Sequence, residues 1–188
     1  MPILKQYKLH LTIIIAWLAM YIFNQTVFNP LIYKSHISFI FLPAGIRILF
    51  ATIYLKQAWI GLFLGALITG FLFLDSDLQS YVLLFSAISA TSPILAVYSV
   101  NALTPLGGQL EYLDIKKVIA ISVMYGIYCG VFHNLATFYL FDLSLQTFIV
   151  DSFAMFIGDM TGSFILLTIL ASQRHRILQF LDSRGITK

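Results

Sequence analysis

The amino-acid sequence predicts an all-α integral membrane protein, a bundle of six transmembrane helices with both termini in the cytoplasm. The 188-residue chain is 60% hydrophobic and only 10% charged, whereas about a quarter of the residues of a soluble domain are charged. Its mean hydropathy is +0.91. Six apolar segments approach the roughly 20 residues that an α-helix needs to cross the hydrocarbon of a bilayer.

The six predicted spans follow one another with short breaks. They cover about residues 10–28, 37–55, 58–74, 80–100, 118–140 and 147–170. The breaks contain turn-forming or charged residues, as at Asn29-Pro30 and Lys56-Gln57, which end helices. The first segment follows two lysines, as a signal peptide would, but its length and the lack of a small-residue cleavage site predict a retained span.

The basic residues predict the orientation. With six spans, the two termini share one side of the membrane, and that side holds all basic residues of the loops and tails but one: Lys5, Lys8, Lys56, Lys116, Lys117, Arg174, Arg176, Arg184 and Lys188. The other side has Lys34. Because cytoplasmic loops are enriched in lysine and arginine, both termini are predicted to be cytoplasmic, and residues 171–188 form a basic cytoplasmic tail.

Two ionisable residues lie deep in predicted spans. Arg47 is about ten residues into the second span and Asp159 about twelve into the sixth; both spans start outside, so a rise of about 1.5 Å per residue puts them at similar depth. A charge in hydrocarbon costs several kcal/mol, so such groups face the bundle interior and often mark functional sites. We expect Arg47 and Asp159 to form an ion pair or to line one polar cavity. A structural pair that only fixes helix register is the alternative.

Further polar residues are predicted in the outer half of the membrane. His133 and Asn134 lie in the fifth span and Asp151 near the start of the sixth. Together they predict a cavity that opens outward and narrows toward Arg47, although a lone buried histidine is often only a packing residue. No histidine pair with metal-ligand spacing and no nucleophile–base pairing is present, so neither a metal, a cofactor nor an enzyme is predicted.

Small residues spaced by four predict close helix contacts. They occur in the third, fifth and sixth spans, at Gly61 and Gly65, Gly126 and Gly130, and Gly158 and Gly162. Such positions let backbones approach in lipid, where apolar burial does not drive helices together. In the second span, Pro43 and Gly45 predict a kink just before Arg47, which a cavity or neighbouring helices must accommodate.

Two passages resemble MASE1-type membrane sensor domains. They are ISFIFLPAGIRILFATIYLKQAWIGLFLGALITG, residues 37 to 70, and FIGDMTGSFILL, residues 156 to 167. The matching positions are Pro43, Gly45, Gly61, Gly65, Gly158, Asp159 and Gly162. The resemblance implies a multi-pass protein of the bacterial inner membrane, of a kind usually fused to a histidine kinase or a diguanylate cyclase. The chain departs from the family in having Phe41-Leu42 before the proline, where a tryptophan is common, and in being shorter.

Two functions follow as expectations. In the first, a MASE1-like sensory protein binds an unknown small ligand and signals through a partner protein in trans, because the tail after residue 170 contains no catalytic domain. In the alternative, the chain resembles the substrate-binding subunit of an energy-coupling-factor transporter and works with a separate ATPase module. Membrane lipid is the expected surrounding, and nucleic acid is not an expected partner because the basic residues lie beside membrane spans.

Overall fold

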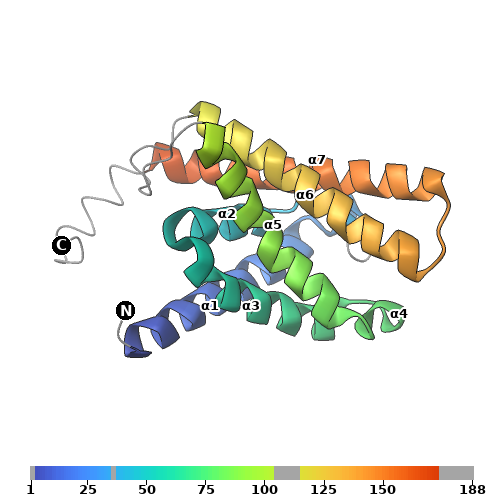
Figure 1. The fold of residues 1–188 in the computed structure, drawn as a ribbon, viewed down its shortest axis with the longest axis horizontal. Coiled ribbons are helices and arrows are strands. Elements are labelled where there is room, and N and C mark those ends of the chain that lie inside the picture. Colours follow the sequence, from blue (N-terminus) through green and yellow to red (C-terminus); the bar gives the residue numbers. More distant parts are fainter. Residues whose placement is uncertain (1–2, 35–36, 104–114, 174–188) are drawn as a thin grey trace.

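The computed structural model describes residues 3–34, 37–103 and 115–173, and these residues are mostly helical (Figure 1). The elements in chain order are α1 (Ile3–Val27), η1 (Asn29–Leu31), β1 (Ile32–Lys34), β2 (Ile37–Ser38), α2 (Pro43–Tyr54), η2 (Leu55–Gln57), α3 (Ala58–Phe73), α4 (Ser76–Gln79), α5 (Val82–Leu103), α6 (Ile115–Leu140) and α7 (Leu145–Ser172). β1 and β2 form a small antiparallel hairpin. The predicted basic tail lies almost entirely outside the described residues.

The structure confirms an all-α membrane bundle. Within the described residues, five helical stretches are long and apolar enough to cross a membrane: Leu4–Val27, Pro43–Phe73, Val82–Leu103, Ile115–Leu140 and Leu145–Leu170. Large apolar side chains face outward, whereas Asn24, Arg47 and Asp159 are buried. Polar groups inside and apolar groups outside are what a lipid environment requires.

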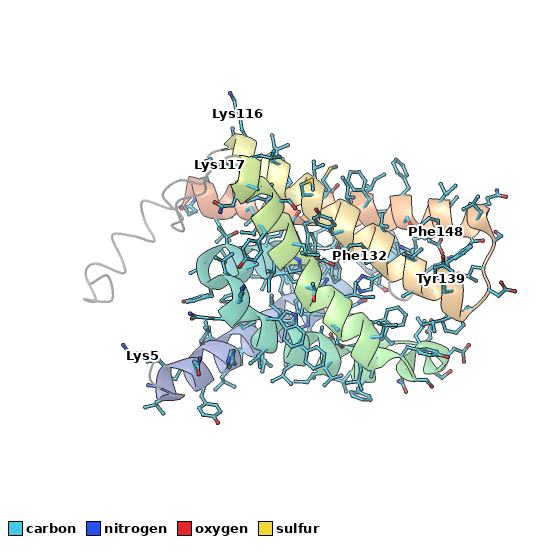
Figure 2. The ribbon with its side chains drawn as sticks, viewed as in Figure 1. Lys5, Lys116, Lys117, Phe132, Tyr139 and Phe148 are labelled. Carbon is cyan, nitrogen blue, oxygen red and sulfur yellow. The ribbon has the colours of Figure 1, made fainter. Side chains whose placement is uncertain are left out.

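The long helices form two pairs, one antiparallel (α6 and α7) and one parallel (α1 and α3), joined by a crossing helix. α6 packs along α7, α1 packs along α3, and α5 crosses between the two pairs (Figure 1). Lys5, Lys116 and Lys117 lie toward the same end of the bundle, and Tyr139 and Phe148 lie toward the other end (Figure 2). At that second end Ser144 caps α7, since its Oγ accepts a hydrogen bond from the Thr147 backbone N–H at 3.1 Å, a standard N-cap contact.

The stretch from Pro43 to Phe73 is two helices and not one. The chain reverses at η2, where Leu55 has a φ of 46°, and α3 runs back in the direction opposite to α2 (Figure 1). The helix α2 has 12 residues, which at a rise of about 1.5 Å each is too short to cross the hydrocarbon by itself.

The predicted helix over residues 37–55 is wrong at its outer end. Residues 37–42 are not helical, and the helix begins only at Pro43. Pro43 therefore starts α2, where its missing N–H costs nothing, and does not kink a longer helix. We call residues 37–42 the extended segment.

Three backbone donors of the extended segment have partners inside the protein. The Phe39 N–H donates to Leu31 O at 3.0 Å, and the Phe41 N–H donates to Gly158 O of α7 at 3.1 Å. The Leu42 N–H donates to the side-chain oxygen of Asn24 in α1 at 2.9 Å. Irregular backbone survives at membrane depth only where such partners exist, so α1 and α7 make this segment possible.

The glycine pairs mark close contacts between elements. On α6, a Cβ at Gly126 or Gly130 would lie 2.9 or 2.7 Å from a carbonyl oxygen of α7. On α3, a Cβ at Gly61 or Gly65 would lie within 3.0 Å of α1 side chains. The pair on α7 differs, because Gly158 and Gly162 lie directly against the backbone of the extended segment. Gly45 packs against Leu166 of α7.

Candidate functional site

A cavity of about 100 Å³ lies between the helices and is lined from α1, α2, α3, α4, α5, α6, α7 and the β-hairpin. It reaches from Arg47 and Asp159 in the interior to Lys34 of β1 and Leu78 of α4. Since a water needs only about 10–15 Å³ of such space, the cavity has room for several waters or for one small ligand.

Arg47 forms one wall at the inner end of the cavity, and its side chain is held by three neighbours. Its Nη1 donates a hydrogen bond to the Tyr125 hydroxyl of α6 at 2.7 Å. Its guanidinium carbon lies 4.1 Å from the centre of the Trp17 ring and 5.6 Å from that of Phe41. Cation–π contacts of this kind are strongest where water is excluded, and Arg47 is only 6% exposed.

The contacts of Arg47 leave part of the guanidinium open. Nη1 contacts Tyr125 and, at 3.9 Å, the sulfur of Cys129. Nε and Nη2 donate to none of the described residues. Since a guanidinium has five N–H donors and cannot lose its proton in a protein, donors remain for a molecule in the cavity.

Trp17 is itself positioned by α3. Its indole N–H donates to the Thr69 hydroxyl at 3.2 Å, and Gly65 leaves the space that the ring occupies, because a Cβ there would lie 2.8 Å from Trp17 Cδ1. The α1–α3 contact thus fixes the aromatic face on which Arg47 rests.

Asp159 of α7 lies in the same cavity lining and is 3% exposed. Its Oδ2 is buried and receives no hydrogen bond from the described part of the chain. Asp159 and Arg47, both described, do not form an ion pair in this structure. Of the two arrangements predicted for them, the structure has the shared cavity and not the direct pair. A buried carboxylate oxygen without a donor is costly, so a donor from a bound molecule or water would stabilise it.

His133 is a further polar group in the wall. Its Nδ1 lies 3.0 Å from the Cys129 carbonyl oxygen, and because a carbonyl only accepts, Nδ1 carries a hydrogen. In the neutral ring Nε2 then accepts a hydrogen bond from the Ser89 hydroxyl, 3.1 Å away. Phe85 stacks on the imidazole with an interplanar angle of 8°. These contacts fix the ring beside the cavity.

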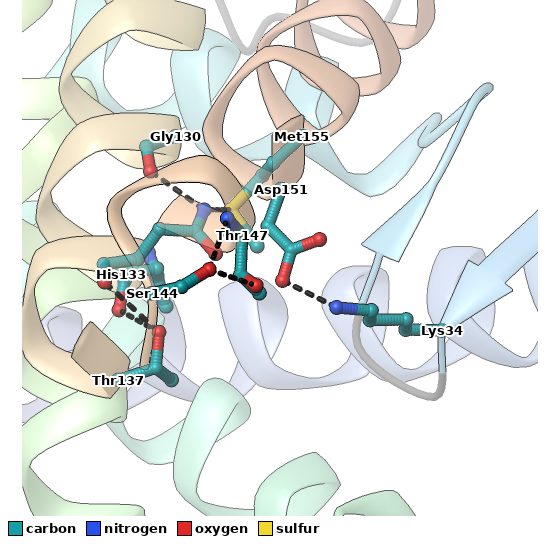
Figure 3. A network of polar contacts seen from close by, with 9 residues as sticks. Lys34, Gly130, His133, Thr137, Ser144, Thr147, Asp151 and Met155 are labelled. Atoms are coloured by element: carbon teal, nitrogen blue, oxygen red, sulfur yellow. Dashed lines mark hydrogen bonds and ion pairs between the residues drawn. The ribbon is translucent and has the colours of Figure 1, made fainter. Parts of the chain in front are cut away.

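Lys34 and Asp151 form an ion pair at the outer end of the cavity. The Lys34 ammonium reaches from β1 to Oδ2 of Asp151 on α7 (Figure 3). The lysine side chain is 37% exposed and the aspartate side chain 6%. The pair ties the hairpin to α7 two turns from the start of that helix.

The predicted polar residues therefore divide into two groups. Arg47, Asp159 and His133 line the cavity, whereas Asn134 and Asp151 do not. Asn134 lies at the α6–α7 contact, where its amide donates to Gly130 O at 2.7 Å and lies near Met155.

Sequence reasoning missed three of the side chains that contact Arg47, namely Trp17, Tyr125 and Cys129, and the partner of Asp151, namely Lys34. One signal for the last was available, because Lys34 is the single lysine on the predicted outer side. No sequence pattern pointed to the other three. Among the described residues, no group of three or more His, Cys, Asp or Glu side chains could hold a metal ion.

No protein family matches the chain, and no curated protein or solved structure matches it either. The assignment of a function therefore depends on the geometry of the cavity and on the resemblance of the two passages quoted above.

Proposed function

We propose that the protein is a MASE1-like sensor of the bacterial inner membrane, which binds a small ligand in the cavity and signals through a partner protein. The observation that carries the proposal is the inner end of the cavity. A purely structural Arg–Asp pair would be closed, whereas here Arg47 has donors to spare and Asp159 has an oxygen without a donor. These are the unfilled positions that a ligand would occupy.

The proposal includes six membrane crossings with both termini in the cytoplasm. Its support is the alternation of chain direction through α1, α2, α3, α5, α6 and α7 (Figure 1). In the second crossing, the non-helical residues 37–42 precede α2, which alone is about 18 Å long. Broken elements of this kind line ligand sites in other membrane proteins. The lysines Lys5, Lys116 and Lys117 at one end agree with this orientation.

Uptake is the second candidate. The same cavity, which is lined by Lys34 at one end, suits a substrate-binding subunit that works with a separate transport ATPase. Both candidates predict a bound small molecule and differ in the partner. Extraction from native membranes in a mild detergent, followed by mass spectrometry, distinguishes them. A co-purifying kinase or cyclase supports the sensor, and an ATPase module supports uptake. A protein with neither ligand nor partner contradicts both.

Cys129 offers a test of the cavity in its natural sequence. It is the single cysteine of the chain, and it lines the cavity. We expect a small charged methanethiosulfonate reagent added outside intact cells to modify Cys129, and the same reagent added only to the cytoplasmic side of inverted vesicles to modify it far more slowly. Equal or reversed rates would contradict the proposed orientation of the cavity.

A further inference from the structure

The inner end of the cavity has a charge pattern that restricts the ligand. We take Arg47 and Asp159 in their ionised forms, which contribute one positive and one negative charge, and the positive charge of Lys34 at the outer end is matched by Asp151 outside the lining. His133, which also lines the cavity, has both ring nitrogens within hydrogen-bond distance of protein atoms. Its neutral form satisfies both contacts, so the cavity wall as a whole has no net charge.

This balance disfavours singly charged ligands. A lone anion would satisfy Arg47 but would leave the Asp159 carboxylate next to a second negative charge in a buried site. A lone cation would satisfy Asp159 and leave the Arg47 donors facing a like charge. Burying a charge without a partner is expensive, whereas a ligand with one charge of each sign and no net charge meets both side chains at once.

The separation of the two side chains also matters. Arg47 is held by its hydrogen bond to Tyr125 and by the face of Trp17, and it forms no ion pair with Asp159. The two charges line one cavity without contacting each other. A ligand placed between them would therefore present its negative group to Arg47 and its positive group to Asp159.

The remaining wall sets the size and character of the rest of the ligand. Ile37, Ala66, Leu74 and Met155 make it largely apolar, and the space is about 100 Å³. There is room for a short apolar side chain and not for a large ring. Resting on the proposed function, the geometry points to a small α-amino acid as the ligand: its carboxylate on Arg47, its ammonium group on Asp159, and its side chain against the apolar wall.

The experiment compares three probes that differ by one charged group. L-alanine has both charges, propionate is alanine without the ammonium group, and ethylamine is alanine without the carboxylate. Thermal unfolding of the purified full chain in detergent is measured with each probe and with L-tryptophan as a bulky control. At about a hundredfold excess over Kd, L-alanine is expected to raise Tm by about 5 °C or more. The other three are expected to raise it by less than about 1 °C at the same concentration.

One substitution is expected to reverse the order of L-alanine and propionate in how much they raise Tm. Asp159→Asn gives the inner end a net positive charge, so propionate is then expected to stabilise the protein more than L-alanine does. Asp142→Asn is the matched control, because Asp142 lies in the α6–α7 turn outside the cavity lining and has a φ of 48°, which asparagine tolerates. This control is expected to keep the wild-type order. If Asp159→Asn does not fold, the inference is still tested by which probe raises the Tm of the wild-type protein most.

The outcomes separate this inference from the function on which it rests. If propionate, ethylamine or L-tryptophan stabilises the wild-type protein at least as well as L-alanine, the ligand is not a small amino acid, but a binding cavity remains. If no probe stabilises it and native mass spectrometry finds a bound molecule of another class, the inference about amino acids is overturned, but the proposed function is not. If no probe binds and the extracted protein is empty, both the inference and the proposed function fail.

Discussion

Two glycine pairs with the same spacing have different partners in this protein. Gly126 and Gly130 of α6 face another helix, and their Cβ positions would meet the carbonyl oxygens of Phe156 and Ser152. Gly158 and Gly162 of α7 face the extended segment instead. A spacing of four small residues therefore indicates that another backbone comes close, but it does not indicate whether that backbone is helical.

The difference has a physical cause. A helix satisfies its own backbone hydrogen bonds, so α7 needs only to fit beside α6. The extended segment cannot do this, and α7 must offer both space, at Gly158 and Gly162, and an acceptor, the Gly158 carbonyl that binds the Phe41 N–H. One face of α7 thus gives this segment room and a backbone acceptor, as a neighbouring strand would in a sheet.

The largest effect should come from filling the space beside the extended segment. In Gly158→Ala the new Cβ would overlap the Ser38 carbonyl oxygen, and backbone that is bonded on both sides cannot move away. We expect a loss of about 3 kcal/mol or more of unfolding free energy, at or above the usual cost of overpacking. Gly126→Ala is the matched control, since both changes gain the same helix propensity. Its overlap with Phe156 is milder. Equal losses in Tm would remove the distinction between the two pairs.

The next largest effect should come from removing an acceptor. Asn24→Ala leaves the Leu42 N–H buried without a partner, which costs about 1–3 kcal/mol. Gln25→Ala changes the neighbouring residue, which lines the cavity, and is expected to cost less. Thermal unfolding of both variants tests this. A neutral Asn24→Ala variant would mean that the extended segment finds another acceptor and is less fixed than the structure indicates.

A smaller effect is expected between the two charges of the cavity. Arg47→Met and Asp159→Asn should each destabilise the protein, and the double variant should recover about 1 kcal/mol relative to the sum, because the second change removes a charge that the first left unbalanced. The control cycle combines Arg47→Met with Asp142→Asn and should be additive. Additivity in the first cycle as well would mean that Arg47 and Asp159 do not interact.

The sequence predicted the long helices well because their evidence is local. Apolar length alone placed α1, α3, α5, α6 and α7 within a few residues, apart from the N-terminal end of α1. It failed for residues 37–42, which are as apolar as a helix but are stabilised in a non-helical conformation by Asn24 and Gly158 from distant parts of the sequence.

The site residues also divide into those that local sequence revealed and those that depend on contacts between distant parts of the chain. Arg47, Asp159 and His133 were recognisable because a polar group in an apolar segment is conspicuous, and all three line the cavity. Asn134 and Asp151 were equally conspicuous but satisfy contacts elsewhere. Trp17 and Tyr125 were not distinguishable from other aromatic residues, because their role depends on which helices pack together.

The smallest effect should come from the outer tether of the extended segment. Asp151→Asn removes the ion pair with Lys34, which joins the hairpin to α7 (Figure 3). Since the lysine side chain is 37% exposed, it can turn to water, and we expect a loss below about 1 kcal/mol that shrinks further in high salt. Thermal unfolding at low and high ionic strength measures it. A loss as large as that of Asn24→Ala would mean that the ion pair, and not the deeper backbone contacts, holds the segment against α7.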